Sequence, residues 1–446
     1  MRQVQAPSLR RWARYRWPLL ITSGVAVTAA FSLSPVVDLA QRNASAAASL
    51  KTPFLYAILA PASNILDTLT LLSPAQYWAT FALCAVVFFA PGIVRDLRRP
   101  RGFNLLSTII SCLRFIGGTV AIVGIMLVVS RPMAPLSLRD PDLIAVDFHS
   151  HTEASHDGRP GFDAERNREW HKSSGFDAAY ITDHRTFDGA LSASERNPSL
   201  AGDGMTLLPG VELRDDGEHP ILLGANPRRM KITSPDWQGA VVEGDAGPVP
   251  PILLLTIPGN IVRVPVNEYT GTIRLAAIEG SDGSPRGMAQ TARDRKGILA
   301  LADKLHLAIV AGSDNHGWGR AAPAWSVLRI PGWRLMTPAS LDIAIRRTIL
   351  ARAPGTTEVI ARRTVGSPSG RLEAATSGVA VGLLMLRTMN LRERLSWILW
   401  SWAGGLLSLI RARRTRRQLR IRVRETMRKR VPRPLIDAAA SVRVAS

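Results

Sequence analysis

The chain has 446 residues, enough for up to about three domains, and 46% of them are hydrophobic. The apolar residues are bunched and the mean hydropathy lies just above zero. These features exclude a disordered chain and argue against a wholly soluble one. Most of the formal net charge of +21 falls in three basic blocks, residues 1–16, 95–101 and 411–433, each beside an apolar segment. Such placement is typical of the cytoplasmic flanks of membrane spans.

Three N-terminal segments are predicted to cross a membrane. Pro18–Val37, Gln76–Val94 and Asn104–Ser130 are each long enough to cross a bilayer core of about 30 Å. For Pro18–Val37, which follows an arginine-rich start, a removed signal peptide is the alternative to an uncleaved span. Pro53–Leu72 is a weaker candidate because it contains an asparagine and an aspartate, and it either crosses or lies along the interface.

The basic blocks distinguish the two topologies. If Pro53–Leu72 does not cross, residues 1–16 and 95–101 both lie inside the cell, as the positive-inside rule requires. If it does cross, the second block lies outside, against the rule. We therefore expect three crossings rather than four, within a membrane region over residues 1–135. The protein would be a multi-pass protein of a bacterial-type inner or plasma membrane, with an extracytoplasmic soluble domain.

Residues 376–432 are predicted to form a membrane-associated segment with a basic tail. Leu395–Ile410 is short for a span but carries three tryptophans, so a final crossing and a surface helix both fit. Arg411–Arg433 is expected to meet anionic headgroups of membrane lipid at the cytoplasmic face, and tethering of nucleic acid is the alternative.

Residues 140–352, between the apolar ends, are predicted to form an α/β domain. The predicted strands are seven short apolar runs: Leu143–Phe148, Ala178–Ile181, Leu207–Leu213, Ile221–Gly224, Ile252–Ile257, Leu275–Ile278 and Leu307–Ala311. Helical patterns at Phe162–Ser174 and Met288–Leu305 lie between some of them. This order favours the parallel strands of a β/α barrel over a sandwich, and about 210 residues suit one such barrel.

Histidines and carboxylates gather at the ends of these runs. His149 and His151 directly follow the first run, at alternate positions that point the same way on an extended segment. Further candidates at strand ends or in adjoining turns are Asp157, His184, Glu212, His219, Asp314 and His316. In a β/α barrel such ends share one face, where active sites gather.

Imidazole and carboxylate together suit Zn²⁺, Mn²⁺ or Fe²⁺. The two cysteines, Cys84 and Cys112, lie inside apolar runs and provide neither a disulfide framework nor a cysteine zinc site. The remaining histidines are weaker candidates. His171 and His306 fall in helical patterns, and His156 could replace Asp157, although the carboxylate beside a glycine is preferred.

The order of the motifs resembles the PHP (polymerase and histidinol phosphatase) family. The matching stretches are DFHSHT at 147–152, HDG at 156–158, GFDAAYITDH at 175–184, GVE at 210–212, HPILLG at 219–224, IEG at 278–280 and GSDNHG at 312–317. They cover about 170 residues. The resemblance implies a distorted (β/α)7 barrel that holds two or three divalent metal ions and mostly hydrolyses phosphoesters.

The resemblance also implies roles for individual residues. His149, His151, Glu212 and Asp314 would belong to the more buried metals, and the cluster would be completed by Asp157, His184, His219 and His316. One departure is Ile257–Pro258, where the family usually has a His–Pro step, so one ligand is missing.

We therefore expect a membrane-anchored, metal-dependent phosphoesterase. A metal-activated water would attack a phosphomonoester or a short nucleotide-type phosphoester. Arg185, directly after His184, and Arg320, four residues after His316, are candidates to bind a phosphate oxygen. The near-neutral domain argues against nucleic acid beyond a short oligonucleotide. The alternative is a non-catalytic membrane sensor or scaffold whose barrel binds metal or ligand, which the missing histidine at Ile257 favours.

Overall fold

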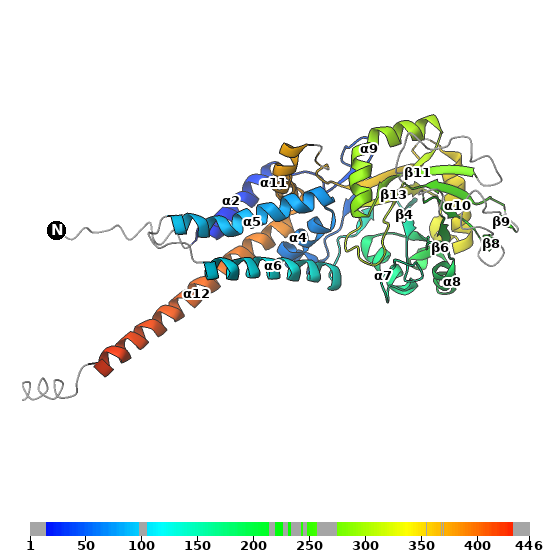
Figure 1. The fold of residues 1–446 in the computed structure, drawn as a ribbon. Coiled ribbons are helices and arrows are strands. Elements are labelled where there is room, and N and C mark those ends of the chain that lie inside the picture. Colours follow the sequence, from blue (N-terminus) through cyan, green and yellow to red (C-terminus); the bar gives the residue numbers. More distant parts are fainter. Residues whose placement is uncertain are drawn as a thin grey trace, which may run out of the picture. The chain divides into compact units, whose positions relative to one another are not determined.

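The chain forms two compact units, Ser32–Met389 and a smaller one made of Met1–Phe31 with Asn390–Ser446 (Figure 1). The computed structural model describes residues 15–97, 105–213, 219–225, 231–232, 242–243, 248–256, 274–353, 355–366, 368 and 370–430. Ile257, the position of the missing histidine, lies outside the described residues.

A ten-stranded sheet organises the larger unit. In sheet order its strands are β1 (Val36–Asp38), β14 (Thr357–Arg362), β13 (Ala324–Arg329), β4 (Leu143–Ser150), β5 (Ala178–Ile181), β6 (Thr206–Glu212), β7 (Ile221–Leu223), β10 (Ile252–Leu255), β11 (Arg274–Asp282) and β12 (Ala308–Gly312). Two separate ladders join β2 (Ala48–Leu50) to β3 (Leu136–Leu138) and β8 (Lys231–Ile232) to β9 (Val242–Glu243). Each of the seven predicted runs coincides with a strand, from β4 to β12.

The sheet curls until β12 comes beside β4. Ser150 of β4 and Asn315, just after β12, form an isolated parallel bridge. The strands β4, β5 and β6 run parallel, as do β10, β11 and β12. The structure is thus mixed α/β and barrel-like.

The expectation of parallel strands throughout is wrong for β7, which runs antiparallel to both β6 and β10. Only eight residues separate β6 from β7. A parallel return needs a crossover of a dozen or more residues, so this short connection reverses the strand.

Helices cover the outside of the curled sheet: α7 (Ala164–Ser174), α8 (Asp188–Glu195), α9 (Pro285–Lys304) and α10 (Pro338–Ala351). The helix α7 shows how the sequence sets its ends. The Asp163 side chain accepts the Arg166 N–H at its start, and Gly175 ends it in the left-handed conformation with φ 85°. Both helices predicted in the domain, α7 and α9, are present.

Alternating side chains of the central strands enter different cores. Ile144, Val146 and Phe148 of β4 belong to one buried cluster, whereas Leu143 and Ala145 belong to another. Both faces of β4 are therefore covered, and all eight of its residues are buried. This rigid strand carries the two histidines of the H-x-H motif at its end.

A polar network is buried in the first of these cores. The Tyr180 hydroxyl donates to Asp342 Oδ1 at 2.8 Å, and Arg346 donates to Asp342 Oδ2 through Nη2 at 2.7 Å. Arg346 also donates to the carbonyls of Val249 and Pro250. Asp342 is thus the carboxylate that pairs with the buried Arg346 guanidinium.

Removing this carboxylate by Asp342→Ala is expected to cost about 3–5 kcal/mol of unfolding free energy, because a buried guanidinium loses its counter-charge. Denaturant unfolding of the detergent-solubilised chain measures the loss. Asp303→Ala, at an exposed position of α9, is the matched control. Equal stability of the two variants would contradict the assigned role of Asp342.

The larger unit also contains five helices away from the outer face of the sheet: α3 (Phe54–Ile58), α4 (Ala60–Thr70), α5 (Pro74–Leu97), α6 (Leu105–Val128) and α11 (Arg371–Thr388). Among the described residues, Pro74–Val94 of α5 and Leu106–Val128 of α6 are long and apolar enough to cross a membrane. A third candidate exists only if α11 and α12 are counted together as one broken span.

The predicted span Pro18–Val37 is not one helix. Helix α2 (Arg16–Ala30) has 15 residues, about 22 Å of rise, which is short of the bilayer core of about 30 Å. Beyond it, Pro35 cannot continue a helix, and Val36–Asp38 pairs with β14 as β1. The expected membrane region 1–135 therefore contains a strand of the main sheet.

Pro53–Leu72 forms the two short helices α3 and α4, and neither is long enough to span. Its polar residues are buried within the larger unit: Asp67 accepts from the Tyr56 hydroxyl at 2.9 Å and pairs with Arg131. Internal packing therefore explains why polar residues interrupt this apolar segment.

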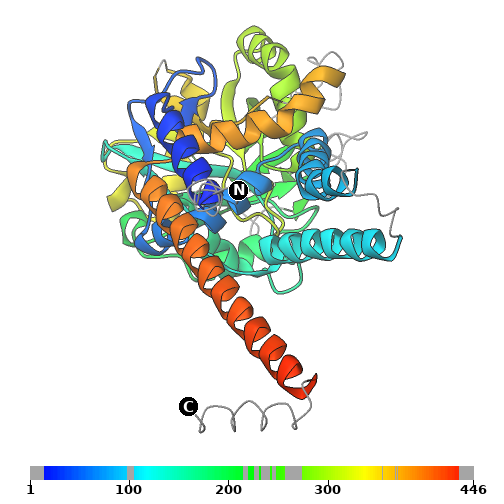
Figure 2. The same ribbon diagram turned by 90° about the vertical axis from the view of Figure 1, so that its left-hand side faces the viewer.

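The smaller unit pairs α2 with α12 (Leu391–Arg430). The Trp402 indole N–H donates to the Thr22 hydroxyl at 3.1 Å, and Gly405 leaves room for Pro18. Helix α12 is continuous over 40 residues, so Leu395–Ile410 runs without a break into the first part of the basic tail (Figure 2).

Candidate metal centre

The eight residues predicted as metal ligands come from one end of the curled sheet. His149 belongs to β4, Glu212 ends β6, and the others follow or precede strands: His151, Asp157, His184, His219, Asp314 and His316. The side chains of His149 and His151 lie on the same side, with ring centroids 5.0 Å apart. The structure brings all eight together.

Glu212 is the centre of the buried part. Its Oε2 lies 3.1 Å from His149 Nε2, 3.2 Å from His151 Nε2 and 3.4 Å from His184 Nδ1. Its Oε1 lies 2.7 Å from His219 Nδ1. Four imidazoles from three stretches of chain therefore surround one carboxylate whose side chain is 3% exposed.

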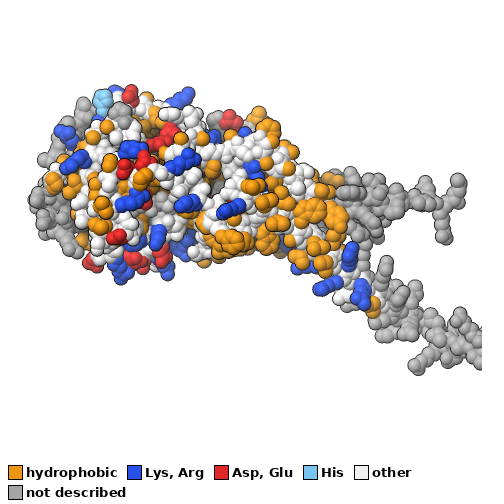
Figure 3. All heavy atoms as spheres, turned by 180° about the vertical axis from the view of Figure 1, so that it is seen from behind, with side chains coloured by type: hydrophobic (Ala, Val, Ile, Leu, Met, Phe, Trp, Pro, Cys, Tyr) orange, Lys and Arg blue, Asp and Glu red, His pale blue; other side chains and the backbone are white. Residues whose placement is uncertain are grey.

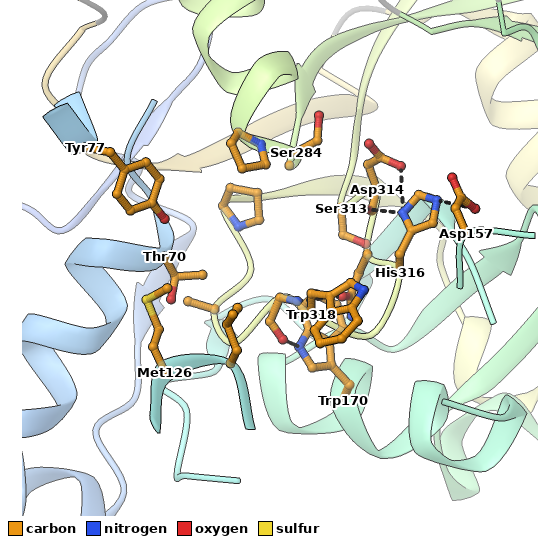
Figure 4. A pocket seen from close by; sticks show the side chains of 17 residues that line it. Thr70, Tyr77, Met126, Asp157, Trp170, Ser284, Ser313, Asp314, His316 and Trp318 are labelled. Atoms are coloured by element: carbon orange, nitrogen blue, oxygen red, sulfur yellow. Dashed lines mark hydrogen bonds and ion pairs between the residues drawn. The ribbon is translucent and has the colours of Figure 1, made fainter. Parts of the chain in front are cut away.

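Two aspartates close the cluster on the other side. Asp314 Oδ1 lies 3.4 Å from both His151 Nε2 and His316 Nδ1. Asp157 reaches His316 Nε2 at 3.2 Å and His184 Nε2 at 3.4 Å. Figure 4 shows His316 between the two aspartates. His156 is 65% exposed at its side chain and lies beside Asp157 at the rim.

The donor set fits divalent metal ions. Both ring nitrogens of His151 and Nε2 of His316 are buried without a hydrogen bond. Four overlapping groups each place their ligand atoms within 4.8 Å of one another: His151, His184 and His316; His149, His151 and Glu212; His156, Asp157 and His184; His184, Glu212 and His219. Such nitrogen and oxygen donors without sulfur suit Zn²⁺, Mn²⁺ or Fe²⁺.

The pKa shifts within the cluster also favour cation binding. Burial alone would lower the pKa of His151, but the nearby carboxylates of Asp314 and Glu212 outweigh burial and raise it to about 9. Burial would raise the pKa of Glu212, yet His149 and the other imidazoles hold it well below its usual range. Protons on imidazoles thus balance the carboxylates when no cation is bound, and a bound cation would take over this role.

The buried pair Asp147 and His171 holds β4 and the segment after β12, which both carry candidate ligands. Asp147 Oδ1 accepts the backbone N–H groups of His149 at 3.2 Å and Ser313 at 2.9 Å. Its Oδ2 lies 2.8 Å from His171 Nε2, and the other ring nitrogen of His171 faces the Asn167 carbonyl. His171, expected to be structural, therefore orients Asp147, which in turn holds the backbone of His149 and Ser313.

Glu279 is the functional candidate that sequence reasoning missed. This fully buried residue of β11 places Oε1 3.0 Å from His149 Nδ1, and its Oε2 has no hydrogen-bond partner. A side chain at Gly312 would collide with both Glu279 and His149, so the glycine keeps this contact possible. The IEG stretch at 278–280 was part of the motif order, but nothing in it marked Glu279 as facing a histidine.

A carboxylate that holds the second nitrogen of a ligating histidine orients the ring and raises its basicity. Glu279→Gln is therefore expected to weaken metal binding about 10–100-fold, measured by metal retention against graded chelator. Glu195→Gln, at an exposed position of α8, is the control. Unchanged retention in Glu279→Gln would show that Glu279 does not tune His149.

The two candidate arginines differ in their placement. Arg185 is exposed beside His184, and its backbone N–H donates to the Glu212 carbonyl at 2.9 Å. Arg320 is not brought to the cluster: Nη2 and Nε donate to the Leu127 carbonyl at 2.7 and 3.2 Å. The carbonyls of the last turn of α6 lack helical partners, and this guanidinium satisfies one of them.

No protein-family model and no curated protein matches this chain. Among solved structures, PsfC from Pseudomonas syringae is 16% identical and covers 55% of this chain and 99% of its own, with a TM-score of 0.31. A putative metal-dependent phosphoesterase from Bifidobacterium adolescentis is 18% identical, with coverage of 47% and 96% and a TM-score of 0.28. The lesion-specific endonuclease PfuEndoQ from Pyrococcus furiosus is 13% identical, with coverage of 49% and 57% and a TM-score of 0.32.

Proposed function

We propose that the chain is a membrane-anchored, metal-dependent hydrolase of phosphoesters. The observation that carries the proposal is the convergence of His149, His151, Glu212 and Asp314 within 3.5 Å contacts at one end of the sheet. Burying these imidazoles and carboxylates together is costly unless protons or bound cations balance the carboxylate charges.

Two groups of residues would hold the ions. His149, His151, Glu212 and Asp314 supply the buried ligands, and Asp157, His184, His219 and His316 supply ligands nearer the surface. Divalent ions in such a site supply a water of lowered pKa and neutralise the charge of a phosphoryl group. The donor set is common to Zn²⁺, Mn²⁺ and Fe²⁺, and the site is large enough for more than one ion.

The protein's own groups orient the ligands and the substrate. Burial lowers the pKa of His184 to about 4, which keeps its imidazole neutral and able to donate an electron pair. Glu279 and Asp147 hold the ring and the backbone of His149. Arg185, exposed next to His184, is the cation we assign to a phosphate oxygen. The contacts of Arg320 give it a structural role instead.

Membrane anchoring through α5 and α6 completes the proposal. Strand β2 precedes α5, β3 follows α6, and the two strands pair. The start of α5 and the end of α6 therefore lie on the side of the sheet. In the sequence, the basic block 95–101 lies between these two apolar helices. By the positive-inside rule this block is cytoplasmic, which makes the metal centre extracytoplasmic.

Hydrolysis of p-nitrophenyl phosphate by the detergent-solubilised full chain, supplied with Mn²⁺, tests the function. His149→Ala is expected to lower kcat/KM at least about 100-fold and to lose metal, since a ligand costs more than an outer partner. His306→Asn, which changes an exposed histidine with φ 52°, is the control for a histidine outside the site.

Arg185→Ala in the same assay is expected to lower kcat/KM about 10–100-fold, the value of a charged hydrogen bond, with metal content unchanged. A protein that binds metal stoichiometrically yet hydrolyses no phosphoester would contradict the proposal and favour a metal-binding sensor or scaffold.

A further inference from the structure

A cavity of about 390 Å³ connects the metal centre to the ends of the long apolar helices. Its volume falls within the range of small-ligand sites, about 300–1,000 Å³. One end is lined by Asp157, Asp314 and His316, and the other by residues of α4, α5 and α6: Thr70, Tyr77, Met126 and Leu127 (Figure 4).

The cavity changes from polar to apolar along its length. Between its ends the cavity is lined mainly by apolar side chains, those of Trp170, Trp318, Ala321 and two prolines, together with the polar Ser284, Ser313 and Asn315. At the helical end the Thr70 and Tyr77 hydroxyls already donate to the carbonyls of Leu66 and Leu69, at 2.8 and 2.6 Å. They therefore present mainly carbon to the cavity. The walls suit a ligand with an anionic head and an apolar chain.

The apolar end lies where α5 and α6 reach the sheet. Tyr77 is in the first turn of α5, and Met126 and Leu127 are in the last turn of α6. Other large apolar side chains of the same helices are exposed, among them Ile125 at 48% and Val86 at 63%. Hydrophobic side chains gather over the helices, whereas charged ones lie mainly over the sheet (Figure 3). If these helices cross a bilayer, their sheet-side ends lie at the level of the lipid headgroups.

We propose that the substrate is a membrane lipid with a terminal phosphomonoester, bound with its phosphate at the metal centre and its chain in this cavity. The inference rests on the proposed hydrolase function. The oxygen of a water forms a new bond to phosphorus, and the bond from phosphorus to the lipid alcohol oxygen breaks. That oxygen keeps the electron pair and takes a proton, which releases inorganic phosphate and the lipid alcohol.

One wall of the cavity is held in place by an arginine. The Arg159 guanidinium lies over the Trp318 ring, 5.1 Å from its centroid, and donates to the Gly317 carbonyl at 3.3 Å, and Trp318 lines the cavity. A soluble phosphomonoester would contact only the metal end and leave the apolar walls unused. A lipid chain covers them and can enter sideways from the bilayer at the ends of α5 and α6.

Two substrates with the same reacting phosphate test the inference. Oleoyl lysophosphatidate in detergent micelles and glycerol 3-phosphate are compared with the metal-loaded full chain, and p-nitrophenyl phosphate reports the chemistry itself. Each methylene buried from water is worth roughly fourfold in binding. We therefore expect kcat/KM for lysophosphatidate to exceed that for glycerol 3-phosphate at least about 100-fold.

Substitutions that fill the apolar end of the cavity test its role independently of the chemistry at the metal centre. Leu127→Trp and Thr70→Trp are each expected to raise the KM for lysophosphatidate about tenfold or more, with little change for p-nitrophenyl phosphate. Ile125→Trp, on the exposed face of α6 and outside the cavity lining, is the matched control and should behave as the wild type. Two independent variants are used so that a folding defect in one of them does not decide the result.

Hydrolysis of p-nitrophenyl phosphate without any preference for the lipid overturns the inference and leaves the proposed function intact. Equal effects of Leu127→Trp and Ile125→Trp overturn it as well. If no phosphoester is hydrolysed, the proposed function fails, and equilibrium binding of lysophosphatidate decides the inference. Binding that Leu127→Trp weakens and Ile125→Trp does not supports the cavity as a lipid site, whereas binding equal in both variants overturns it.

Discussion

One buried carboxylate, Glu212, holds the imidazoles of His149, His151, His184 and His219 within 3.4 Å. Burying Glu212 together with the rings of His149 and His151 is costly, and hydrogen bonds satisfy only part of these groups, because both ring nitrogens of His151 have none. Divalent cations would compensate this cost. The rest of the site is arranged around that constraint: Asp147 ties β4 to the segment after β12, and Glu279 fixes the His149 ring.

Most of the sheet and the candidate ligands could be predicted from the sequence. Short apolar runs followed by a histidine or an acid mark strand ends, and the ends of a curled sheet meet, so spacing alone placed His149, Glu212 and Asp314 in one cluster. The fold differed where tertiary context decides. The reversal of β7 depends on the length of one connection, and Val36–Asp38 joins the sheet because an open strand edge at β14 accepts it.

Other differences had no signal in a single sequence. Glu279 lies mid-strand, where an acid gives no hint that it is buried against an imidazole. Arg320 stands four residues from His316 but turns to the end of α6, since unpaired helical carbonyls attract a guanidinium. Asn64 and Asp67 made Pro53–Leu72 ambiguous as a span, and the structure explains them as buried packing residues. Hydropathy measures composition and cannot distinguish burial in protein from burial in lipid.

The proposed lipid substrate and the metal centre are linked by position: the cavity begins at Asp314 and ends at α4, α5 and α6. The central claim is nevertheless the metal centre itself. X-ray absorption at the metal edge of the purified full chain tests it most directly. The account predicts a stoichiometric transition metal with imidazole nitrogen and carboxylate oxygen as ligands and no sulfur, and loss of this signal in Glu212→Ala. A protein without stoichiometric metal, or a sulfur-ligated metal that Glu212→Ala retains, would contradict it.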